Sequence, residues 1–439
     1  MKPTLSRVLA AVLISSAAPA AAQTAPAPAP EPAPAPAPDP APAVPVEPTP
    51  AADLTVKPVA TPAPEAATDD FDLASLGLDP NAAAFDDKLQ IYGFADFTYL
   101  HVGAVGAVVP TTSAFTVGNL NIYLKKNLAR RWRSLAEVRM LFTPNGSGNL
   151  VVAPYTSTAT TDPANEERPI HWGGISIERA YVEYDATSWL TVRAGHFLTP
   201  YGIWNIDHGS PVIISVGRPY EIGEELFPQH QTGIEVFGTH RVGDYGIEYH
   251  ATVSNGRNPY EATRDPDRKL GIGGRFAVEA PWAGTFRAGV SAYSGTALEE
   301  SGGIYKELAL GADVSWNHGG FHAQGELLSQ QRVYDEGHRA PGQFGFEPDG
   351  RAWGAYALAG YRFDAVWNAM PYAVFEHYVP YDPTFLSAHT NGVTAGINLR
   401  PTPTVVLKAE VLRGMFGGDF GYLAGRTLDL ARVQCAWVF

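Results

Sequence analysis

Long hydrophobic runs, cysteine and lysine are all scarce in this chain of 439 residues. Beyond the first 22 residues no stretch reaches about 18 consecutive apolar residues, so no transmembrane helix is expected. The one cysteine, Cys435, cannot form an intrachain disulfide and excludes a multi-cysteine zinc site. Lysine and arginine total 31 against 45 acidic residues, a formal charge of −14, which argues against nucleic acid as a partner.

The first part of the chain reads as targeting and spacer sequence. Residues 1–22 combine basic Lys2 and Arg7, a short apolar core and small residues before Gln23, which predicts a cleaved secretory signal. Residues 23–68 are rich in Ala-Pro and are expected to form an extended periplasmic linker, because proline fixes φ and removes backbone donors. Residues 24–65 either contact peptidoglycan or act as a passive spacer. Residues 69–88 are expected to be a short periplasmic segment.

Residues 89–439 alternate apolar and polar side chains with a period of two, as strands do. Residues 247–253 are the clearest case, with apolar Ile247, Tyr249 and Val253 separated by Glu248, His250 and Thr252. The pattern predicts sixteen strands: 89–102, 115–128, 132–143, 175–186, 188–197, 231–240, 245–255, 269–280, 285–296, 306–317, 321–334, 352–363, 369–379, 391–400, 404–416 and 429–438.

The links between these strands are short and long by turns. Bacterial outer-membrane barrels typically have an even number of strands, each about ten residues long. Tight turns join the strands at one end of the barrel and longer loops join them at the other. Closure of the barrel removes free sheet edges, whose backbone amides and carbonyls find no hydrogen-bond partners in lipid. The sequence therefore predicts an all-β fold: a transmembrane antiparallel β-barrel of sixteen strands, preceded by an N-terminal Ala/Pro-rich extended segment.

Two stretches resemble the phosphate-selective porin O and P family: residues 179–184 (RAYVEY) and 190–202 (LTVRAGHFLTPYG). The C-terminal Phe439 resembles the assembly signal of outer-membrane barrels. The resemblance implies a homotrimer in the outer membrane of a Gram-negative bacterium, in contact with lipid and lipopolysaccharide. It also implies an inward-folded third loop and recognition of Phe439 by the barrel-assembly machinery. The barrel has few lysines, unlike the phosphate-specific members, so phosphate specificity does not follow.

The longest predicted loop, 198–230, is the candidate pore constriction. Its charged side chains are expected to face arginines of the pore wall and so to sieve solutes by size and dipole. The candidate constriction residues are Asp207, Arg218, Glu221, Glu224 and Glu225. The candidate wall residues are Arg139, Arg179, Arg193, Arg275 and Arg287. In the alternative interpretation the loop lies on the outer surface and its acids are solvated. Independently of the loop, many of the strand arginines are expected to pair with Glu137, Glu183, Glu235 or Glu279 and so to hold the wall together.

These features predict a porin for passive diffusion of small hydrophilic solutes or ions, with no enzymatic activity, cofactor or metal. Glu248 and His250 share a strand face and are expected to hydrogen-bond rather than to bind a cation. The sequence His208-Gly209-Ser210 does not by itself build a catalytic triad. Two other functions stay open: an anion- or phosphate-selective channel, and a structural barrel that anchors the envelope through residues 24–65.

Overall fold

The computed structural model describes the barrel region and leaves most of the N-terminal region out. The described residues are 88–105, 111–142, 172–206, 209–223, 225–257, 268–299, 303–339, 341–342, 345–346, 348–381, 387–419, 421 and 423–439. The predicted signal (1–22), the linker (23–68) and nearly all of segment 69–88 lie outside these residues. No helix of the described part is both long and apolar enough to cross a membrane.

Sixteen antiparallel strands close into one barrel, which confirms the predicted fold class. In chain order they are β1 (Gln90–Val102), β2 (Thr112–Ala129), β3 (Trp132–Phe142), β4 (Trp172–Thr187), β5 (Leu190–Leu198), β6 (His230–Val242), β7 (Tyr245–Ser254), β8 (Gly271–Ala280), β9 (Thr285–Leu298), β10 (Ile304–His318), β11 (Phe321–Tyr334), β14 (Gly350–Tyr361), β15 (Met370–Val379), β16 (His389–Thr402), β17 (Val405–Gly417) and β18 (Thr427–Val438). Each predicted strand has its counterpart, with ends that differ by a few residues.

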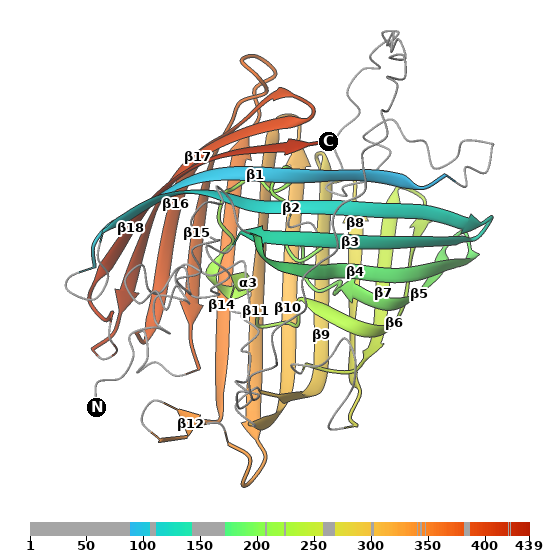
Figure 1. Ribbon diagram of the computed structural model, residues 1–439, viewed down its shortest axis with the longest axis horizontal. Coiled ribbons are helices and arrows are strands. Elements are labelled where there is room, and N and C mark those ends of the chain that lie inside the picture. Colours follow the sequence, from blue (N-terminus) through green and yellow to red (C-terminus); the bar gives the residue numbers. More distant parts are fainter. Residues whose placement is uncertain are drawn as a thin grey trace, which may run out of the picture. The chain divides into compact units, whose positions relative to one another are not determined.

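The first and last strands pair with each other and so close the barrel (Figure 1). Their register runs from Phe94 opposite Val438 to Val102 opposite Leu430. Beyond it, the amide of Gly93 donates to the carbonyl of Phe439, and the amide of Phe439 donates back to Gly93, both at 2.9 Å. Every strand therefore has two neighbours, which is the condition for a sheet in hydrocarbon.

Apolar side chains point outward from the barrel and polar ones point inward, the reverse of a water-soluble sandwich. Strand β15 shows the alternation: the Phe375 side chain is 52% exposed, whereas the next residue, Glu376, is 3% exposed. Cys435 lies opposite Phe97 on β1, on the same outward face of β18 as exposed Val433. The sole thiol is therefore placed among outward-facing apolar side chains.

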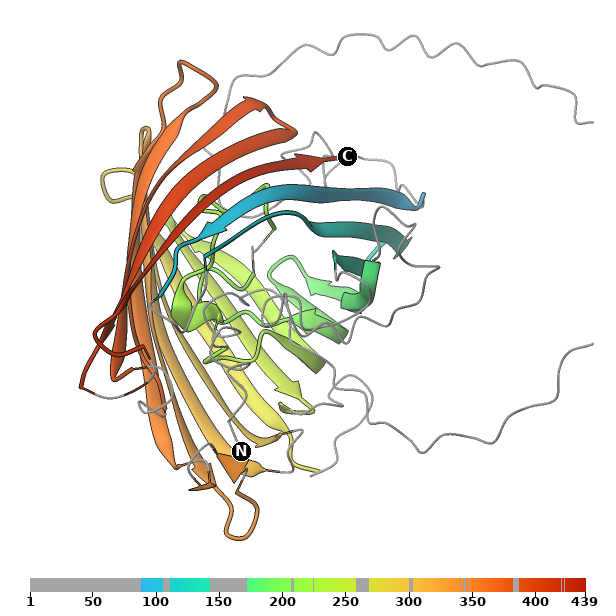
Figure 2. The same cartoon turned by 60° about the vertical axis from the view of Figure 1, so that its left-hand side comes forward.

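Two small elements were not predicted. The link 335–351 contains a two-stranded hairpin, β12 (Pro341–Gly342) and β13 (Gly345–Phe346). The connection between β5 and β6 contains the four-residue helix α3 (Tyr220–Gly223), which lies within the ring of strands in both views (Figures 1 and 2). Elements of two to four residues are too short to show a period in the sequence.

The outward face of β9 tests the membrane orientation of the barrel. Val290 is 57% exposed at the middle of this strand. We expect Val290→Arg to destabilise the barrel by about 2–4 kcal/mol in a lipid bilayer, because a guanidinium at the midplane is costly. Ser294→Arg, on the same face and about one residue farther from the strand centre, should cost less, because the cost falls toward the membrane interfaces. Denaturant titration in liposomes measures both, and equal costs would contradict a midplane position for Val290.

Candidate functional site

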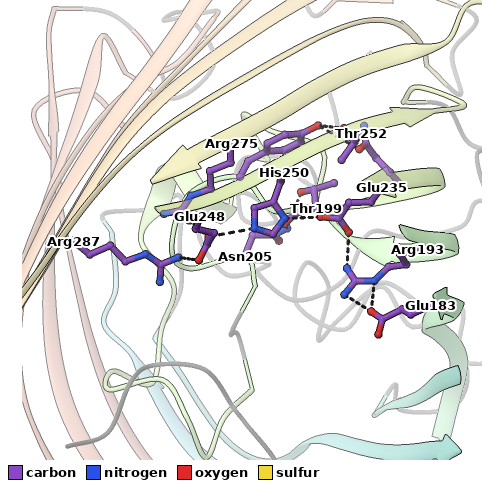
Figure 3. A network of polar contacts seen from close by, with 12 residues as sticks. Glu183, Arg193, Thr199, Asn205, Glu235, Glu248, His250, Thr252, Arg275 and Arg287 are labelled. Atoms are coloured by element: carbon purple, nitrogen blue, oxygen red, sulfur yellow. Dashed lines mark hydrogen bonds and ion pairs between the residues drawn. The ribbon is translucent and has the colours of Figure 1, made fainter. Parts of the chain in front are cut away.

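A ladder of ion pairs runs across the inner face of strands β3 to β10. All five predicted wall arginines belong to it, and each has a carboxylate partner on the same wall. The pairs are Arg139–Glu178, Arg179–Glu137, Arg193–Glu183, Arg193–Glu235, Arg275–Glu248, Arg275–Asp313 and Arg287–Glu248. Figure 3 shows the central part of the ladder, from Glu183 to Arg287. The arginines therefore pair with acids, as predicted for Glu137, Glu183 and Glu235. Glu279 pairs with Arg241 instead, and the partners Glu178, Glu248 and Asp313 were not predicted.

The strand register creates this ladder. Glu183 lies opposite Arg193 on β5, and Arg193 lies opposite Glu235 on β6, so one guanidinium joins two carboxylates at 2.7 and 2.6 Å. The guanidinium carbon also stands 4.4 Å from the Tyr181 ring centroid and 4.6 Å from that of Phe237. Arginine suits this position because a planar guanidinium can stack on rings and bond two acids at once.

His250 continues the ladder between two carboxylates. Its Nδ1 is 2.8 Å from Glu235 and its Nε2 is 3.2 Å from Glu248. Glu248 in turn accepts hydrogen bonds from Arg275, at 2.6 Å, and from Arg287 (Figure 3). The Glu248–His250 pair is thus a link in a hydrogen-bonded chain, and none of the described residues forms a group suited to hold a metal ion.

The connection 199–229, between β5 and β6, begins with a tight attachment to β9 and β11. The amides of Ile203 and Trp204 donate to the two oxygens of Glu326, at 3.0 and 2.9 Å. The amide of Gly202 donates to Ser291 Oγ at 3.2 Å. Gly202 has φ +74° and its Cβ position would lie 1.9 Å from a Glu326 oxygen. A side chain at this position would therefore push the connection away from the glutamate.

The middle of the connection is held by side chains of β15, β16 and β17. Glu410 accepts the amides of Val216 and Gly217, at 2.8 and 3.1 Å, and Glu376 accepts that of Tyr220 at 2.8 Å. The ammonium group of Lys408 donates to two carbonyls of the same segment, those of Ser210 and Ser215, at 2.7 and 2.9 Å.

These contacts show that the connection crosses the interior of the barrel. In the ring of sixteen strands, β5 and β15 stand eight places apart, and so do β6 and β16. A segment that leaves β5 and returns to β6 therefore reaches the opposite wall. Apolar side chains of the connection, among them Trp204, Leu226 and Phe227, pack against Tyr356 and other inward residues of that wall. The barrel interior is divided by this segment rather than left as one open cylinder.

Two of the five predicted constriction residues have described side chains. Arg218 donates to Gln229 Oε1 at 3.4 Å, and Glu225 lies 4.0 Å from Arg257. Burial, together with the nearby guanidinium of Arg139, lowers the pKa of Arg218 to about 10. Asp207 and Glu224 lie outside the described residues, as does the side chain of Glu221, so nothing here places them.

Sequence reasoning missed the wall residues that hold the connection, among them the charged residues Glu326, Glu376, Glu410 and Lys408. The cross-strand neighbours of Glu376 could have pointed to its role. Its cross-strand neighbours are Tyr356 and Gly392, so this inward acid has no basic partner beside it. Gly392 also leaves it room, because a Cβ there would lie 2.2 Å from a Glu376 oxygen. An inward acid without a cross-strand base must find its partner elsewhere.

Ser210, the serine of the sequence His208-Gly209-Ser210, has a structural role in the described part of the chain. Its hydroxyl donates to Asp96 on β1, and its carbonyl accepts from Lys408. His208 lies outside the described residues.

Comparisons with known proteins support the barrel fold. No protein-family model matches the chain. An uncharacterized protein of Aquifex aeolicus is 24% identical over 302 residues, which cover 61% of this chain and 66% of that protein. The anion-selective porin from Comamonas acidovorans superposes with a TM-score of 0.54 at 12% identity, covering 80% of this chain and 99% of its own. The trimer form of OmpT from Vibrio cholerae gives 0.51 at 8%, covering 80% and 99%. The chain thus has the sixteen-stranded fold of outer-membrane porins.

The ion-pair ladder predicts a large cost for removing its central guanidinium. We expect Arg193→Ala to lower the free energy of unfolding by about 2–4 kcal/mol, because the buried acids Glu183 and Glu235 would lose the guanidinium between them and keep only Arg133 and His250 as partners. Arg241→Ala is the matched control: Arg241 is 73% exposed and 3.6 Å from Glu279, and its loss should cost under about 0.5 kcal/mol. Urea unfolding in detergent micelles compares the two, and similar losses would show that the ladder adds no stability.

Proposed function

We propose that the chain is an outer-membrane porin for passive diffusion of small hydrophilic solutes or ions, with the connection 199–229 as its constriction. One observation carries this proposal: the main chain of that connection hydrogen-bonds to Glu376 and Glu410, on the wall opposite to its origin. A segment that crosses the lumen narrows the path of any solute. The polar inner wall and the shared porin fold support an aqueous path.

The charge arrangement favours a channel of modest selectivity. On the wall formed by β3 to β10, guanidinium and carboxylate groups alternate in direct contact, so their fields largely cancel within a few ångströms. Such a wall holds water and small polar solutes without strong preference for one sign of charge. We therefore favour general diffusion over phosphate specificity, although residues 179–202 resemble the phosphate-selective family.

An anion-selective channel is the second candidate, and Arg218 is the observation that favours it. In the described part of the chain this guanidinium has a hydrogen bond to the neutral amide of Gln229 and no ion pair within 4 Å, and it lies near Arg139. Positive charge at a narrow point attracts anions. The similar barrel from Comamonas acidovorans is described as an anion-selective porin.

The proposal includes the outer membrane as the location and a homotrimer as the assembly. The outward apolar face of the strands suits a lipid environment. The similar OmpT barrel of Vibrio cholerae has a trimer form. We also propose that the barrel-assembly machinery recognises Phe439.

Planar-bilayer recordings test the function directly. We expect the purified chain to form ohmic channels, and a variant in which residues 210–217 are replaced by a short Gly-Ser link to conduct more current per channel, because the lumen is then wider. A variant with the same replacement at 336–339, in the external link after β11, is the control for loop shortening. Negligible conductance of the parent chain would reject the porin, and equal conductance of parent and 210–217 variant would reject the constriction.

Charge at the constriction should set the permeability ratio. We expect Arg218→Gln to shift the reversal potential in a salt gradient toward cation preference, and Glu225→Gln to shift it the opposite way. A reversal potential equal to that of the parent in either variant would place the substituted residue outside the conduction path.

A further inference from the structure

The middle of the crossing connection, residues 210–220, is hydrogen-bonded to the barrel wall mainly through its main chain. Wall side chains accept the amides of Val216, Gly217 and Tyr220. Other wall side chains donate to five carbonyls of the segment, those of Ser210, Pro211, Val212, Ile214 and Ser215. Among the side-chain hydrogen bonds described for this segment, the Ser210 hydroxyl alone donates to the wall, at Asp96.

The wall groups come from three neighbouring strands and match the segment by polarity. Glu376 on β15 and Glu410 on β17 are the acceptors for amides. Asn398 and Arg400 on β16, with Lys408 on β17, are the donors to carbonyls, at 2.7–3.4 Å. Segment 210–220 lies in a protein interior with no ladder of its own, so its backbone groups would otherwise lack partners, which is costly.

Glu410 is held by other wall side chains as well as by the connection, and Lys408 is buried beside it. Glu410 accepts the hydroxyl of Tyr372 at 2.7 Å and pairs with Arg432 at 2.9 Å. Lys408 is 2% exposed, and its described hydrogen bonds both go to carbonyls of the connection. Hydrogen bonds from charged groups held in this way are stronger than neutral ones and fix geometry. The wall therefore offers a rigid pattern of donors and acceptors.

We propose that Glu376, Lys408 and Glu410 are the positioning residues of the constriction, and that they act by hydrogen-bonding to its main-chain amides and carbonyls. The position of segment 210–220 is then set by these hydrogen bonds to its main chain, together with the packing of Ile213, Ile214 and Tyr220 against apolar residues. This inference rests on the proposed function only where it speaks of a constriction, because the attachment itself is a property of the fold.

Amide exchange in the full chain, refolded in detergent micelles, tests the attachment separately from conduction. In Glu410→Gln, one amide oxygen replaces two carboxylate oxygens, and the new NH₂ group repels one of the two loop amides. We expect exchange in peptides covering 210–220 to rise about tenfold, with exchange in the strands unchanged. Glu376→Gln, which removes no described ion pair, and Lys408→Met should act in the same direction. If Glu410→Gln does not fold, amide exchange in these two variants tests the attachment.

Two controls distinguish the loss of these main-chain hydrogen bonds from a general loss of structure. Val216→Ala keeps the amide that donates to Glu410 and changes the side chain, so it should leave exchange as in the parent. Glu279→Gln removes a partly exposed carboxylate of β8, a strand far from β15 to β17 in the ring, and should do likewise. The inference is overturned if Glu376→Gln, Lys408→Met and Glu410→Gln all exchange like the parent, or if Val216→Ala raises exchange as much as they do.

Single-channel recordings of the same variants then address the constriction. Higher and noisier conductance in the three wall variants would support both proposals. Faster exchange with unchanged conductance would support the positioning role and reject the constriction as part of the proposed function.

Discussion

Hydrocarbon offers no hydrogen bonds, and the architecture of this chain depends on that constraint. Every amide and carbonyl of a membrane-spanning sheet must be paired within the protein. The pairing of β1 with β18 meets this requirement by closing the ring. Closure also separates an inside from an outside, so the period-two sequence can place Phe375 toward lipid and Glu376 toward the lumen. The polar interior, with its demand for partners, follows from the same constraint.

The inward polar groups find their hydrogen-bond and ion-pair partners in different ways on the two sides of the barrel. On β3 to β10 the charges satisfy one another, because the register places acids beside arginines, as with Glu183, Arg193 and Glu235. On β11 and β15 to β17 some inward charged residues have only neutral or like-charged neighbours on the adjacent strands. Others have an oppositely charged neighbour and can still form further hydrogen bonds. They bind the main chain of the crossing segment instead, as Glu326 and Lys408 do. Polar groups of strand and segment thereby satisfy each other.

The strands could be predicted from the sequence because each carries its own signal over ten or more residues. The wall arginines could be found for the same reason, since an inward position is fixed by alternation. The attachment of the crossing segment could not be found in this way. Its partners are far apart in the chain, as with Val216 and Glu410, and no local pattern connects them. Helix α3 was missed because four residues do not show a helical period.

The closing seam has a consequence for the order in which the barrel folds. Gln434 donates to Thr98 across 336 residues of chain, so this contact is among the most distant that the molecule makes. Loop-closure entropy delays distant contacts, and sheets that depend on them fold slowly. Until β18 arrives, β1 and the last strand already in place each present an unpaired edge, which invites pairing with other chains. The seam is therefore the natural last step of folding, and the one at which a growing barrel most needs protection from its neighbours.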